Sequence, residues 1–445
     1  MGVFQSLRGF GHLHRQTPEG LRQVGEGSHD RGPILTFGLP RLSKKTIKDI
    51  NITGKNLLIR VDFNVPLDDH GKITDDARIV KSLPTIQYAL GKASRMVLMS
   101  HLGRPDGKVN PKYSLRPVAV HLSKLLSAPV QFLEDCVGPQ IEERVSKFTL
   151  GEVILLENLR FHSEEEKNDP QFAQALARLG DLYVNDAFGA AHRAHASTEA
   201  VTHFLPSVAG LLMAKEIAYF EKILRKPERP FVTILGGAKV SDKIKIVGNL
   251  LQKTDALLIG GAMAYPFCRV KGWSIGNSKY ETGGEELARQ ILDQAKQKGV
   301  AVHLPIDHVV AQKLEKGAVT KVVDQQIPPG WMALDVGPKT VEQFKKVLSS
   351  AKTILWNGPL GVFETIPFDR GSREVAQFIA SLEATTVIGG GDTAAAIHQF
   401  GLEEKMSHVS TGGGASLEFL EGKVLPGVAC LPESENRIET GAERN

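Results

Sequence analysis

The sequence has few cysteines and no long apolar run. Cys136, Cys268 and Cys430 are the only three among 445 residues, and they lie far apart, with no second cysteine or histidine at the spacing of a metal site. This pattern argues against a zinc site and a disulfide framework, and it favours a reducing compartment. No apolar stretch reaches the roughly 18 residues that a bilayer requires, so the sequence predicts no membrane-spanning segment.

An excess of one charge is lacking as well. The chain carries 54 Lys and Arg against 50 Asp and Glu, a net charge of +4. That balance is unlike a protein that binds nucleic acid through bulk charge. Glycine is plentiful at 44 residues, and apolar residues reach 42%, which is typical of α/β proteins and excludes a disordered chain. The length predicts about two to three domains.

The two ends differ from the rest of the chain and are excluded from the predicted fold. Residues 1–41 contain eight Gly, five Arg and no Lys, without helical or strand periodicity. They have three interpretations: a stretch that is not translated, with the true start of translation at Leu42; an organelle-targeting segment; or a disordered tail. Residues 432–445 are polar and acidic, which predicts a disordered tail. The expected location is the cytoplasm, with targeting through residues 1–41 as the alternative.

Between these ends, short runs of Val, Ile and Leu alternate with longer helical patterns, which predicts βαβ units and parallel sheets. The runs form two groups, which predict domains over residues 42–208 and 227–406; the last run of the second group, "HVSTGGGASLEFL", falls in residues 407–431. Between them, a helix over residues 209–226 carries an apolar stripe and must stop before Pro227. One further helix face is formed by Leu115, Val118, Ala119, Leu122, Leu125 and Leu126. We therefore expect an α/β fold of two doubly wound, Rossmann-like parallel-sheet domains joined by a helix.

The residues that follow the apolar runs differ between the two groups, and ligands of open parallel sheets bind at these carboxyl ends. Arg and His side chains suit a small, multiply anionic molecule, whereas glycine loops that open helices suit nucleotide phosphates. The first group ends in Arg60, Asp62, Asn64, His101, Arg104, Arg160, His162, His192, Arg193 and His195. The second group ends in Gly236-Gly237, Gly260-Gly261, Gly358, Gly389-Gly390-Gly391 and Gly412-Gly413-Gly414.

Each of these signals also has a simpler interpretation. A lone Arg after a strand is usually solvated, and a lone Gly usually makes a tight turn. Asp392 either caps a helix or holds the Mg²⁺ that accompanies a nucleotide. Lys239 and Lys243, four residues apart, are expected on one face of the first helical turn after a glycine pair, where they repel each other unless an anion lies between them.

Motifs of several other nucleotide enzymes are missing. Neither a Walker A sequence nor a G-x-G-x-x-G in the right setting occurs, which argues against a P-loop NTPase, a protein kinase and a dinucleotide dehydrogenase. No acidic or cysteine partner stands at metal-site spacing from His101, His192 or His195, so these histidines are expected to be structural or to contact an anion. No general base is evident.

Taken together, the segments at the strand ends resemble the phosphoglycerate kinase family. The match runs in order from Ser43 to Leu431, through "RVDFNVP", "MSHLGRPDG", "ENLRFHSEEE", "VNDAFGAAHRAHAS", "LGGAKVSDK", "WNGPLGVFE", "GGGDT" and "STGGGASLEFLEGKVLPG". The resemblance implies two Rossmann-like lobes, with residues 407–431 returning to the first, and hinge closure between them. It implies reversible, Mg²⁺-dependent phosphoryl transfer between ATP and the carboxylate of 3-phosphoglycerate, giving ADP and 1,3-bisphosphoglycerate. A carboxylate is already ionised at pH 7, which accounts for the missing base.

The resemblance also implies roles for individual residues. Arg78, Lys239 and Lys243 are expected to be catalytic, and Asp392 to hold Mg²⁺ through the nucleotide phosphates. The residues expected to bind 3-phosphoglycerate are Asp62, Phe63, Asn64, Arg78, His101, Leu102, Gly103, Arg104, Arg160 and Arg193. Those expected to bind the nucleotide are Gly237, Ala238, Lys239, Lys243, Leu334, Asn357, Pro359, Glu364, Gly390, Gly391, Asp392 and Thr393.

Two alternatives to an active kinase remain open at this stage. A silent scaffold on the same fold is expected to have lost Arg78, Lys239 or Asp392, and a kinase for another acid to have changed its arginines; neither change is present. No insertion follows "RFHSEEE", which favours a bacterial-type enzyme. The resemblance implies a monomer acting on small molecules, without nucleic acid or membrane as a partner.

Overall fold

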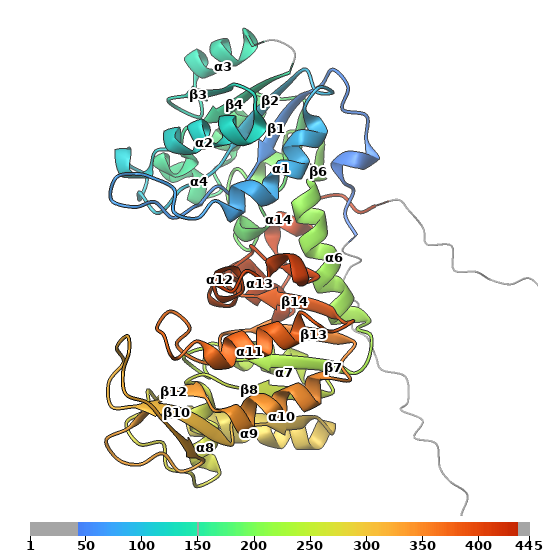
Figure 1. Cartoon of the computed structure of the whole chain (residues 1–445). Coiled ribbons are helices and arrows are strands. Elements are labelled where there is room, and N and C mark those ends of the chain that lie inside the picture. Colours follow the sequence, from blue (N-terminus) through green and yellow to red (C-terminus); the bar gives the residue numbers. More distant parts are fainter. Residues whose placement is uncertain (1–42, 149–150, 435–445) are drawn as a thin grey trace, which may run out of the picture. The chain divides into compact units, whose positions relative to one another are not determined.

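The computed structural model describes residues 43–148 and 151–434. The expectations for residues 1–41 and for most of the acidic tail therefore lie outside the described residues. The described chain contains two six-stranded sheets and one three-stranded sheet, with helices packed against them (Figure 1). Its α/β class agrees with the sequence-based expectation.

The first sheet is parallel throughout, with the strand order β3-β4-β2-β1-β5-β6. Successive residues of a strand point to opposite faces, and both faces are buried: Leu58 packs in one apolar cluster, and Leu57 and Ile59 pack in another. This double burial explains why the strands appear as continuous apolar runs. The strands are β1 (Asn56–Arg60), β2 (Arg95–Met99), β3 (Val130–Leu133), β4 (Glu152–Leu156), β5 (Leu182–Asn185) and β6 (Ser207–Ala209).

The second large sheet is also parallel, in the order β15-β14-β13-β7-β8-β9. Its two faces are buried in the same way, with Trp356 fully buried on one of them. Both sheets thus have the doubly wound arrangement that the sequence predicts. The strands are β7 (Phe231–Leu235), β8 (Ala256–Ile259), β9 (Ala301–His303), β13 (Thr353–Asn357), β14 (Thr385–Gly389) and β15 (His408–Val409).

A small antiparallel sheet was not expected from the sequence. It has the order β11-β10-β12, formed by β10 (Asp307–Ala311), β11 (Lys321–Asp324) and β12 (Met332–Val336). Its strands mix charged and apolar residues, and β11 is mostly exposed. A search for continuous apolar runs therefore passes over them, because only strands buried on both faces give such runs.

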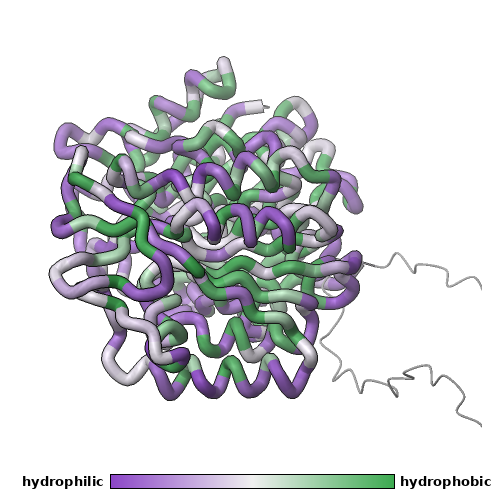
Figure 2. The backbone as a smooth tube through the Cα atoms, turned by 60° about the horizontal axis from the view of Figure 1, so that its bottom comes forward, coloured by the Kyte–Doolittle hydropathy of each residue, from purple (hydrophilic) through white to green (hydrophobic). Residues whose placement is uncertain are grey.

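The helices cover both faces of the large sheets, and the tube in Figure 2 shows hydrophobic residues along the central strands with hydrophilic residues on the outer helical turns. Helices up to the connector are α1 (Ala77–Ala89), α2 (Arg116–Leu126), α3 (Pro139–Ser146), α4 (Ser163–Glu166), α5 (Pro170–Ala177) and α6 (Leu211–Arg225). Later helices are α7 (Ile244–Leu250), α8 (Ala264–Val270), α9 (Gly284–Lys298), α10 (Pro338–Leu348), α11 (Arg370–Ile379), α12 (Gly391–Gln399), α13 (Gly414–Leu420) and α14 (Pro426–Ala429). Short 3-10 helices are η1 (Ile47–Asp49), η2 (Pro111–Tyr113), η3 (Leu159–Phe161), η4 (Phe188–Ala190), η5 (Ala200–His203) and η6 (Glu403–Lys405).

Helix α6 lies where the sequence predicts a connecting helix. Met213, Ile217 and Phe220 of its apolar stripe are buried, and the helix ends at Arg225, before Pro227. The stripe belongs to a cluster that also contains Leu58 of the first sheet and Leu355 of the second. One apolar cluster therefore reaches both large sheets through this helix.

The last described segment returns to the first sheet. Helices α13 and α14, red in Figure 1, contact η4, which follows β5. The side chain of Asn185, in β5, donates a hydrogen bond of 3.1 Å to the Gly427 carbonyl. Beyond α14, the amide of Lys45 donates to the Pro432 carbonyl at 2.9 Å, and that of Ser434 to the Ser43 carbonyl at 2.8 Å. Within the described residues, no helix combines the length and apolarity needed to cross a bilayer.

Candidate active site

We call the carboxyl ends of β1, β2, β4 and β5 the first edge, and those of β7, β13 and β14 the second edge. The strands of each edge are parallel, so their following loops gather on one side of each sheet.

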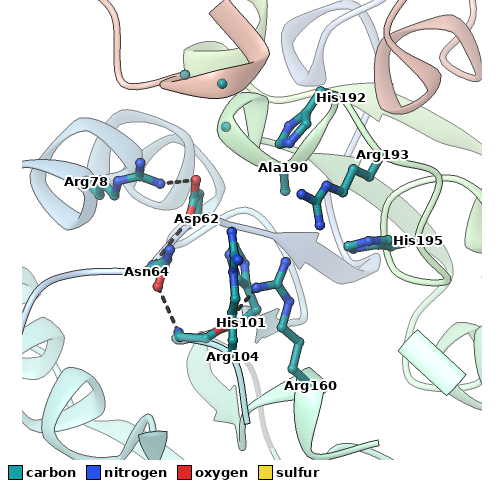
Figure 3. A pocket seen from close by; sticks show the side chains of 14 residues that line it. Asp62, Asn64, Arg78, His101, Arg104, Arg160, Ala190, His192, Arg193 and His195 are labelled. Carbon is teal, nitrogen blue, oxygen red and sulfur yellow. Dashed lines mark hydrogen bonds and ion pairs between the residues drawn. The ribbon is translucent and has the colours of Figure 1, made fainter. Parts of the chain in front are cut away.

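A cavity of about 220 Å³ opens at the first edge, and we call it the arginine cavity. Figure 3 shows the guanidinium groups of Arg160 and Arg193 facing the same space. With a single carboxylate against four arginines, the lining is strongly cationic and suits a molecule with several negative charges. The lining residues are Asp62, Asn64, Arg78, His101, Gly103, Arg104, Arg160, Gly189, Ala190, His192, Arg193, His195, Gly412 and Gly414.

Asp62 and Arg78 form an ion pair across the cavity mouth, from the loop after β1 to the first turn of α1. Burial would raise the pKa of Asp62, but the cations Arg78 and Arg60 outweigh it and lower the pKa to about 2. Asp62 is therefore ionised at any pH at which the protein works. The pair fixes Arg78 in place without neutralising the remaining arginines.

A chain of hydrogen bonds shapes the cavity floor. The Asn64 side-chain oxygen accepts from the Gly103 amide at 2.9 Å, and the Gly103 carbonyl accepts from Arg160 Nη1 at 2.8 Å. These hydrogen bonds connect the loops that follow β1, β2 and β4 without the help of a ligand. Burial lowers the pKa of the Arg160 guanidinium, while Glu166 at 3.3 Å from its Nε acts in the opposite direction.

The three histidines of the cavity are held neutral. Burial lowers the pKa of His101 well below its usual value, although Asp62 opposes this. Burial and the charges of Arg160, Arg60 and Arg193 lower the pKa of His195 to about 3, and burial also lowers that of His192. Neutral imidazoles donate hydrogen bonds to an anion without adding repulsion among the arginines.

Arg60 does not line the cavity, although it ends β1. It is 1% exposed and lies beneath the cavity, where its Nη2 is 3.1 Å from His101 Nδ1. Its Nε donates to Ser197 Oγ at 2.8 Å, and Ser197 in turn donates to Glu165 at 2.6 Å. Arg60 therefore supports the cavity wall and is compensated by a buried carboxylate.

The second edge is built mainly from backbone. The Gly237 amide donates to the Pro359 carbonyl at 3.0 Å, and the Gly358 amide donates to Thr393 Oγ at 2.6 Å. A Cβ on Gly236 would lie 2.1 Å from the Pro359 carbonyl oxygen. Loops from β7, β13 and β14 therefore approach so closely that side chains would not fit between them.

Lys243 and Asn357 join this edge through a hydrogen bond between the lysine ammonium and the amide oxygen. The Nδ2 of Asn357 is buried without a hydrogen-bond partner among the described residues. Burial lowers the pKa of Lys243, while Asp242 and Asp392 act in the opposite direction. An unpaired amide donor and a half-buried lysine on one edge suit an anionic ligand.

The predicted helical face for Lys239 and Lys243 is wrong. Helix α7 begins only at Ile244, so Lys239 is exposed in the preceding loop and Lys243 occupies the N-cap. The Gly236-Gly237 loop packs closely against the loop after β13, and the residues between Gly237 and Ile244 are not helical. Of the five glycine ends, only Gly389-Gly390-Gly391 and Gly412-Gly413-Gly414 lead directly into helices, α12 and α13.

The start of α12 is open to a ligand. Gly390 is its N-cap, without a capping side chain, so the first amide groups of the helix are not bonded by a cap. A Cβ on Gly391 would meet nothing within 4 Å. Asp392 lies in the first turn and is exposed, so it does not cap the helix. This helix start offers an anion site with a carboxylate beside it.

Arg78 lines a second cavity as well, of about 180 Å³, which we call the bridging cavity. This cavity brings α1 together with the start of α12 and with the Gly413 loop. Its lining consists of Asp75, Ala77, Arg78, Lys81, Gly391, Ala394, Ala395, His398, Glu403, Ser410, Thr411 and Gly413. Arg78 therefore faces both the arginine cavity and residues that follow β14.

Other residues named from the sequence lie elsewhere. Phe63 and Leu102 are buried in the first-sheet core, Leu334 lies in β12, and Glu364 is exposed in the loop after β13. His162 faces away from the arginine cavity lining, toward Asp135. The sequence-based binding set omitted Gly189, Ala190, His192, His195, Gly412 and Gly414 from that lining, although "HRAH" and "TGGG" already marked four of them.

The sequence profile of the family described as Phosphoglycerate kinase matches residues 47–423. The chain belongs to the phosphoglycerate kinase family. It is 53% identical over 396 residues to the phosphoglycerate kinase of Pseudothermotoga lettingae, and 55% identical over 403 residues to that of Thermosipho africanus. These alignments cover 88% and 89% of this chain and the whole of each relative.

Solved structures agree with this assignment. The phosphoglycerate kinase of Coxiella burnetii superposes with a TM-score of 0.79 at 41% identity, covering 87% of this chain and 98% of that one. The enzyme of Pyrococcus horikoshii gives 0.73 at 33% identity. As a member of the phosphoglycerate kinase family, the chain is a kinase that transfers a phosphoryl group between ATP and 3-phosphoglycerate, and kinases of this family use ATP with a divalent metal.

Proposed function

We propose that the two edges divide this reaction between them, with the acid at the first edge and the nucleotide at the second. At the first edge, Arg104, Arg160 and Arg193 bind the phosphate and carboxylate of 3-phosphoglycerate. Asp62 accepts a hydrogen bond from its hydroxyl group, and Asn64 and His101 complete the cavity. The cationic lining and the tied loops support this assignment.

At the second edge, the nucleotide phosphates lie against the start of α12 and the glycine loops. Lys243 and the unpaired Asn357 amide donate to phosphate oxygens, and Gly237, Gly390 and Gly391 allow the backbone to approach them. Ala238 and Lys239 border the same loop, and Thr393 and Pro359 hold its shape. Leu334 and Glu364 contribute at the adenosine end.

The residues present fit a Mg²⁺ ion carried by the nucleotide. Asp392 is an exposed carboxylate beside an open helix start, and hard oxygen ligands are those that Mg²⁺ prefers. When bound, the ion would neutralise charge on the phosphate oxygens. Asp392 would hold it together with the nucleotide.

The position of Arg78 carries the proposal, because this guanidinium lines both cavities. The carboxylate of the acid attacks the terminal phosphorus of ATP, and the bond to the leaving oxygen of ADP breaks; no proton has to be removed first. Arg78 then neutralises charge on the phosphoryl group between the two edges, with Lys239 assisting from the second. Lys239 and Asp392 do not line the arginine cavity, so the edges must close toward each other, which also excludes water.

The test is the replacement Arg78→Ala, assayed as Mg²⁺-dependent ADP formation from ATP and 3-phosphoglycerate. We expect kcat to fall by roughly 100-fold or more, because the lost cation acts mainly on the transferring group. The Kd for ADP, measured by calorimetry, should change by less than about threefold. Arg78→Lys keeps the positive charge but loses the planar set of N–H donors of the guanidinium. Its kcat should lie between those of Arg78→Ala and the wild type.

Two results would contradict the assignment. An equal loss of ADP affinity in Arg78→Ala would mean that Arg78 binds nucleotide instead of acting on the phosphoryl group. Turnover with 2-phosphoglycerate, acetate or aspartate in place of 3-phosphoglycerate would mean that the arginine cavity takes another acid. The boundaries of the lobes, the monomeric state and the cytoplasmic location stay predictions.

A further inference from the structure

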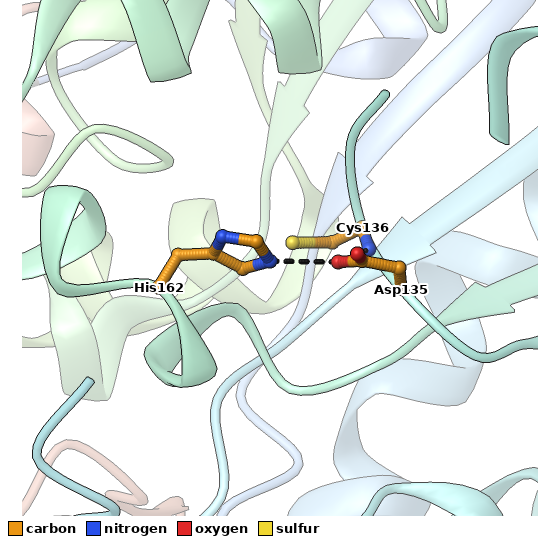
Figure 4. A group of neighbouring side chains, drawn as sticks. All are labelled: Asp135, Cys136 and His162. Atoms are coloured by element: carbon orange, nitrogen blue, oxygen red, sulfur yellow. Dashed lines mark hydrogen bonds and ion pairs between the residues drawn. The ribbon is translucent and has the colours of Figure 1, made fainter. Parts of the chain in front are cut away.

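Three side chains that the reaction does not use lie together beside the first sheet: Asp135, Cys136 and His162 (Figure 4). A carboxylate oxygen, the thiol sulfur and an imidazole nitrogen all lie within 4.8 Å of one another. Among the described residues, this is the group of His, Cys, Asp and Glu side chains that meets this distance. Each of the three is a common metal ligand.

The fold, not the local sequence, brings this group together. Asp135 and Cys136 follow β3, whereas His162 follows β4 by way of η3, and β3 pairs with β4. The ligands therefore come from the ends of neighbouring strands, 26 positions apart between Cys136 and His162. The absence of a cysteine–histidine motif in the sequence does not exclude such a site.

The three groups point at one another. His162 Nε2 lies 2.7 Å from an oxygen of Asp135, which also accepts from the Cys136 amide at 2.7 Å. Phe172 packs against the imidazole at 5.2 Å between ring centroids and so limits its rotation. The side chains of Asp135 and His162 are 50% and 30% exposed, whereas Cys136 is buried. A cation would therefore bind from the side of Asp135 and His162, which are partly open to solvent, with the buried thiol behind them.

The surroundings favour positive charge. Glu157 and Glu165 act electrostatically on the Cys136 thiol, and Glu164 acts on His162. Burial, with Asp135 and these glutamates, raises the pKa of the thiol well above its usual value.

We propose that Asp135, Cys136 and His162 form a binding site for a soft divalent cation of the Zn²⁺ class. A thiolate and a carboxylate give two negative charges, which balance the ion, and the neutral imidazole adds a third ligand. Water completes a four-coordinate shell. Because thiolate selects soft metals, Mg²⁺ is not a competitor, and the site is independent of the proposed reaction.

Binding requires a defined rearrangement. Binding releases to solvent the thiol proton and the proton that His162 Nε2 shares with Asp135, and the imidazole stays neutral with its proton on Nδ1, so that sulfur and Nε2 both offer lone pairs. Ligand atoms of a tetrahedral Zn²⁺ lie about 3.5 Å apart, so Asp135 and His162 must separate by about 1 Å from their 2.7 Å contact. The half-exposed Asp135 side chain has room to move.

The site is tested by titrating the chelator-treated full chain, without a histidine tag, with Co²⁺ and then Zn²⁺. We expect one Co²⁺ per chain, with a thiolate-to-cobalt charge-transfer band and the visible bands of a tetrahedral ion. Zn²⁺ should remove both, and a large excess of Mg²⁺ should not. Circular dichroism and Mg²⁺-dependent turnover report whether each protein is folded.

Variants identify the ligands. Cys136→Ser should abolish the charge-transfer band, and His162→Gln and Asp135→Asn should each weaken Co²⁺ binding by at least about tenfold. Cys268→Ser is the matched control, because Cys268 is also buried but belongs to no such group among the described residues. It should keep both the band and the affinity.

Three outcomes would overturn the proposal. These are a folded wild-type chain without the band, a band that survives in Cys136→Ser, and a band that Zn²⁺ does not remove. If Cys136→Ser does not fold, the Co²⁺ affinities of His162→Gln and Asp135→Asn test the proposal instead. Both variants are expected to fold, because they change partly exposed side chains. Unchanged Co²⁺ affinity in these two variants would leave Asp135 and His162 as an ordinary ion pair beside a core cysteine.

Discussion

The two edges of this molecule recognise anions by different means. At the first edge, Arg78, Arg104, Arg160 and Arg193 converge on one cavity, and the charge comes from side chains. At the second, glycine loops and the start of α12 present backbone amides, and Lys243 is the cation that joins them. Both edges occur at the carboxyl ends of parallel sheets, so topology fixes where each site lies but not its chemistry.

This difference has a consequence for tolerance to mutation. A side-chain site loses one contact when one arginine is removed, and its neighbours remain. A backbone site fails as a unit, because an added Cβ displaces a whole loop. The second edge should therefore be sensitive to changes as small as one methyl group, and the first edge should respond in proportion to the charge removed.

The largest effect is expected for Gly236→Ala. Its Cβ would lie 2.1 Å from the Pro359 carbonyl oxygen and 2.5 Å from that of Gly358, so the loops after β7 and β13 must separate. We expect the Kd for Mg²⁺–ATP to rise by roughly 100-fold, about 2.7 kcal/mol. Binding of 3-phosphoglycerate, measured by calorimetry on the same protein, should stay within about threefold.

Gly248→Ala is the matched control for this change. Gly248 lies in α7, and a Cβ there would meet nothing within 4 Å. Alanine should leave ATP binding unchanged and raise the stability slightly, since it is the better helix former. If Gly236→Ala binds ATP as the wild type does, the second edge is not a close-packed backbone site. The contrast between a side-chain site at the first edge and a backbone site at the second would then be wrong.

An intermediate effect is expected from removing one cation at each edge. Arg160→Met should raise the KM for 3-phosphoglycerate by roughly 10- to 100-fold, while the KM for ATP changes little, because Arg160 lines the arginine cavity and not the bridging cavity. Lys243→Met should produce the reverse pattern. Steady-state kinetics with each substrate varied in turn separates the two.

Equal changes of both KM values in either variant would contradict the assignment of the acid to the first edge and the nucleotide to the second. Such a result would mean that a cation at one edge positions the ligand at the other before the edges close. The replacement Lys345→Met provides a control for loss of a lysine, because Lys345 lies in α10 and pairs with Glu342 and Glu374. Both KM values should be unaffected by it.

The smallest effect concerns Asp186, which follows β5 but contacts the start of α6 and lines neither the arginine cavity nor the bridging cavity. It caps α6 by accepting from the Leu212 and Met213 amides at 2.9 and 3.2 Å. Burial raises its pKa to about 7, despite these hydrogen bonds. A raised folded-state pKa stabilises the fold at low pH, below the unfolded value near 4, and this contribution is lost as pH rises through 7.

Asp186→Asn should remove this dependence. Asparagine stays neutral and keeps the acceptor for the α6 amides. From pH 5 to pH 7, urea unfolding should show that the wild type loses about 1–2 kcal/mol relative to the variant. Equal slopes for the two proteins over this range would mean that Asp186 is ionised in the folded chain throughout.

Strands buried on both faces were predictable from the sequence, and most of the shorter or more exposed strands were not, although β15, at one border of the second sheet, was predicted. Strands β1, β2, β4 and β5 appear as continuous apolar runs because each face contacts helices. Strand β3 has one fully buried residue, Leu133, and the antiparallel β10–β12 sheet mixes charge with apolar residues. Neither leaves a pattern that a search for parallel core strands detects.

The same distinction holds for the site. Charged residues at strand ends were predictable individually, because an Arg or His after a buried run is visible in the sequence. Which way they point was not: Arg60 lies beneath the cavity, and His162 lies beside Cys136. The late start of α7 at Ile244 was also missed, and so was the contact between Gly236 and Pro359, which joins residues more than a hundred positions apart.

The pairing of Ser43–Lys45 with Pro432–Ser434 bears on the order in which the chain can fold during synthesis. The second large sheet uses residues between Phe231 and Val409, a continuous stretch. The apolar cluster that contains Leu58 of the first sheet and Leu355 of the second also includes Phe419 and Val428, so its packing stays incomplete until that late segment is made. The first sheet is therefore synthesised early, but its packing is completed only by the last described residues.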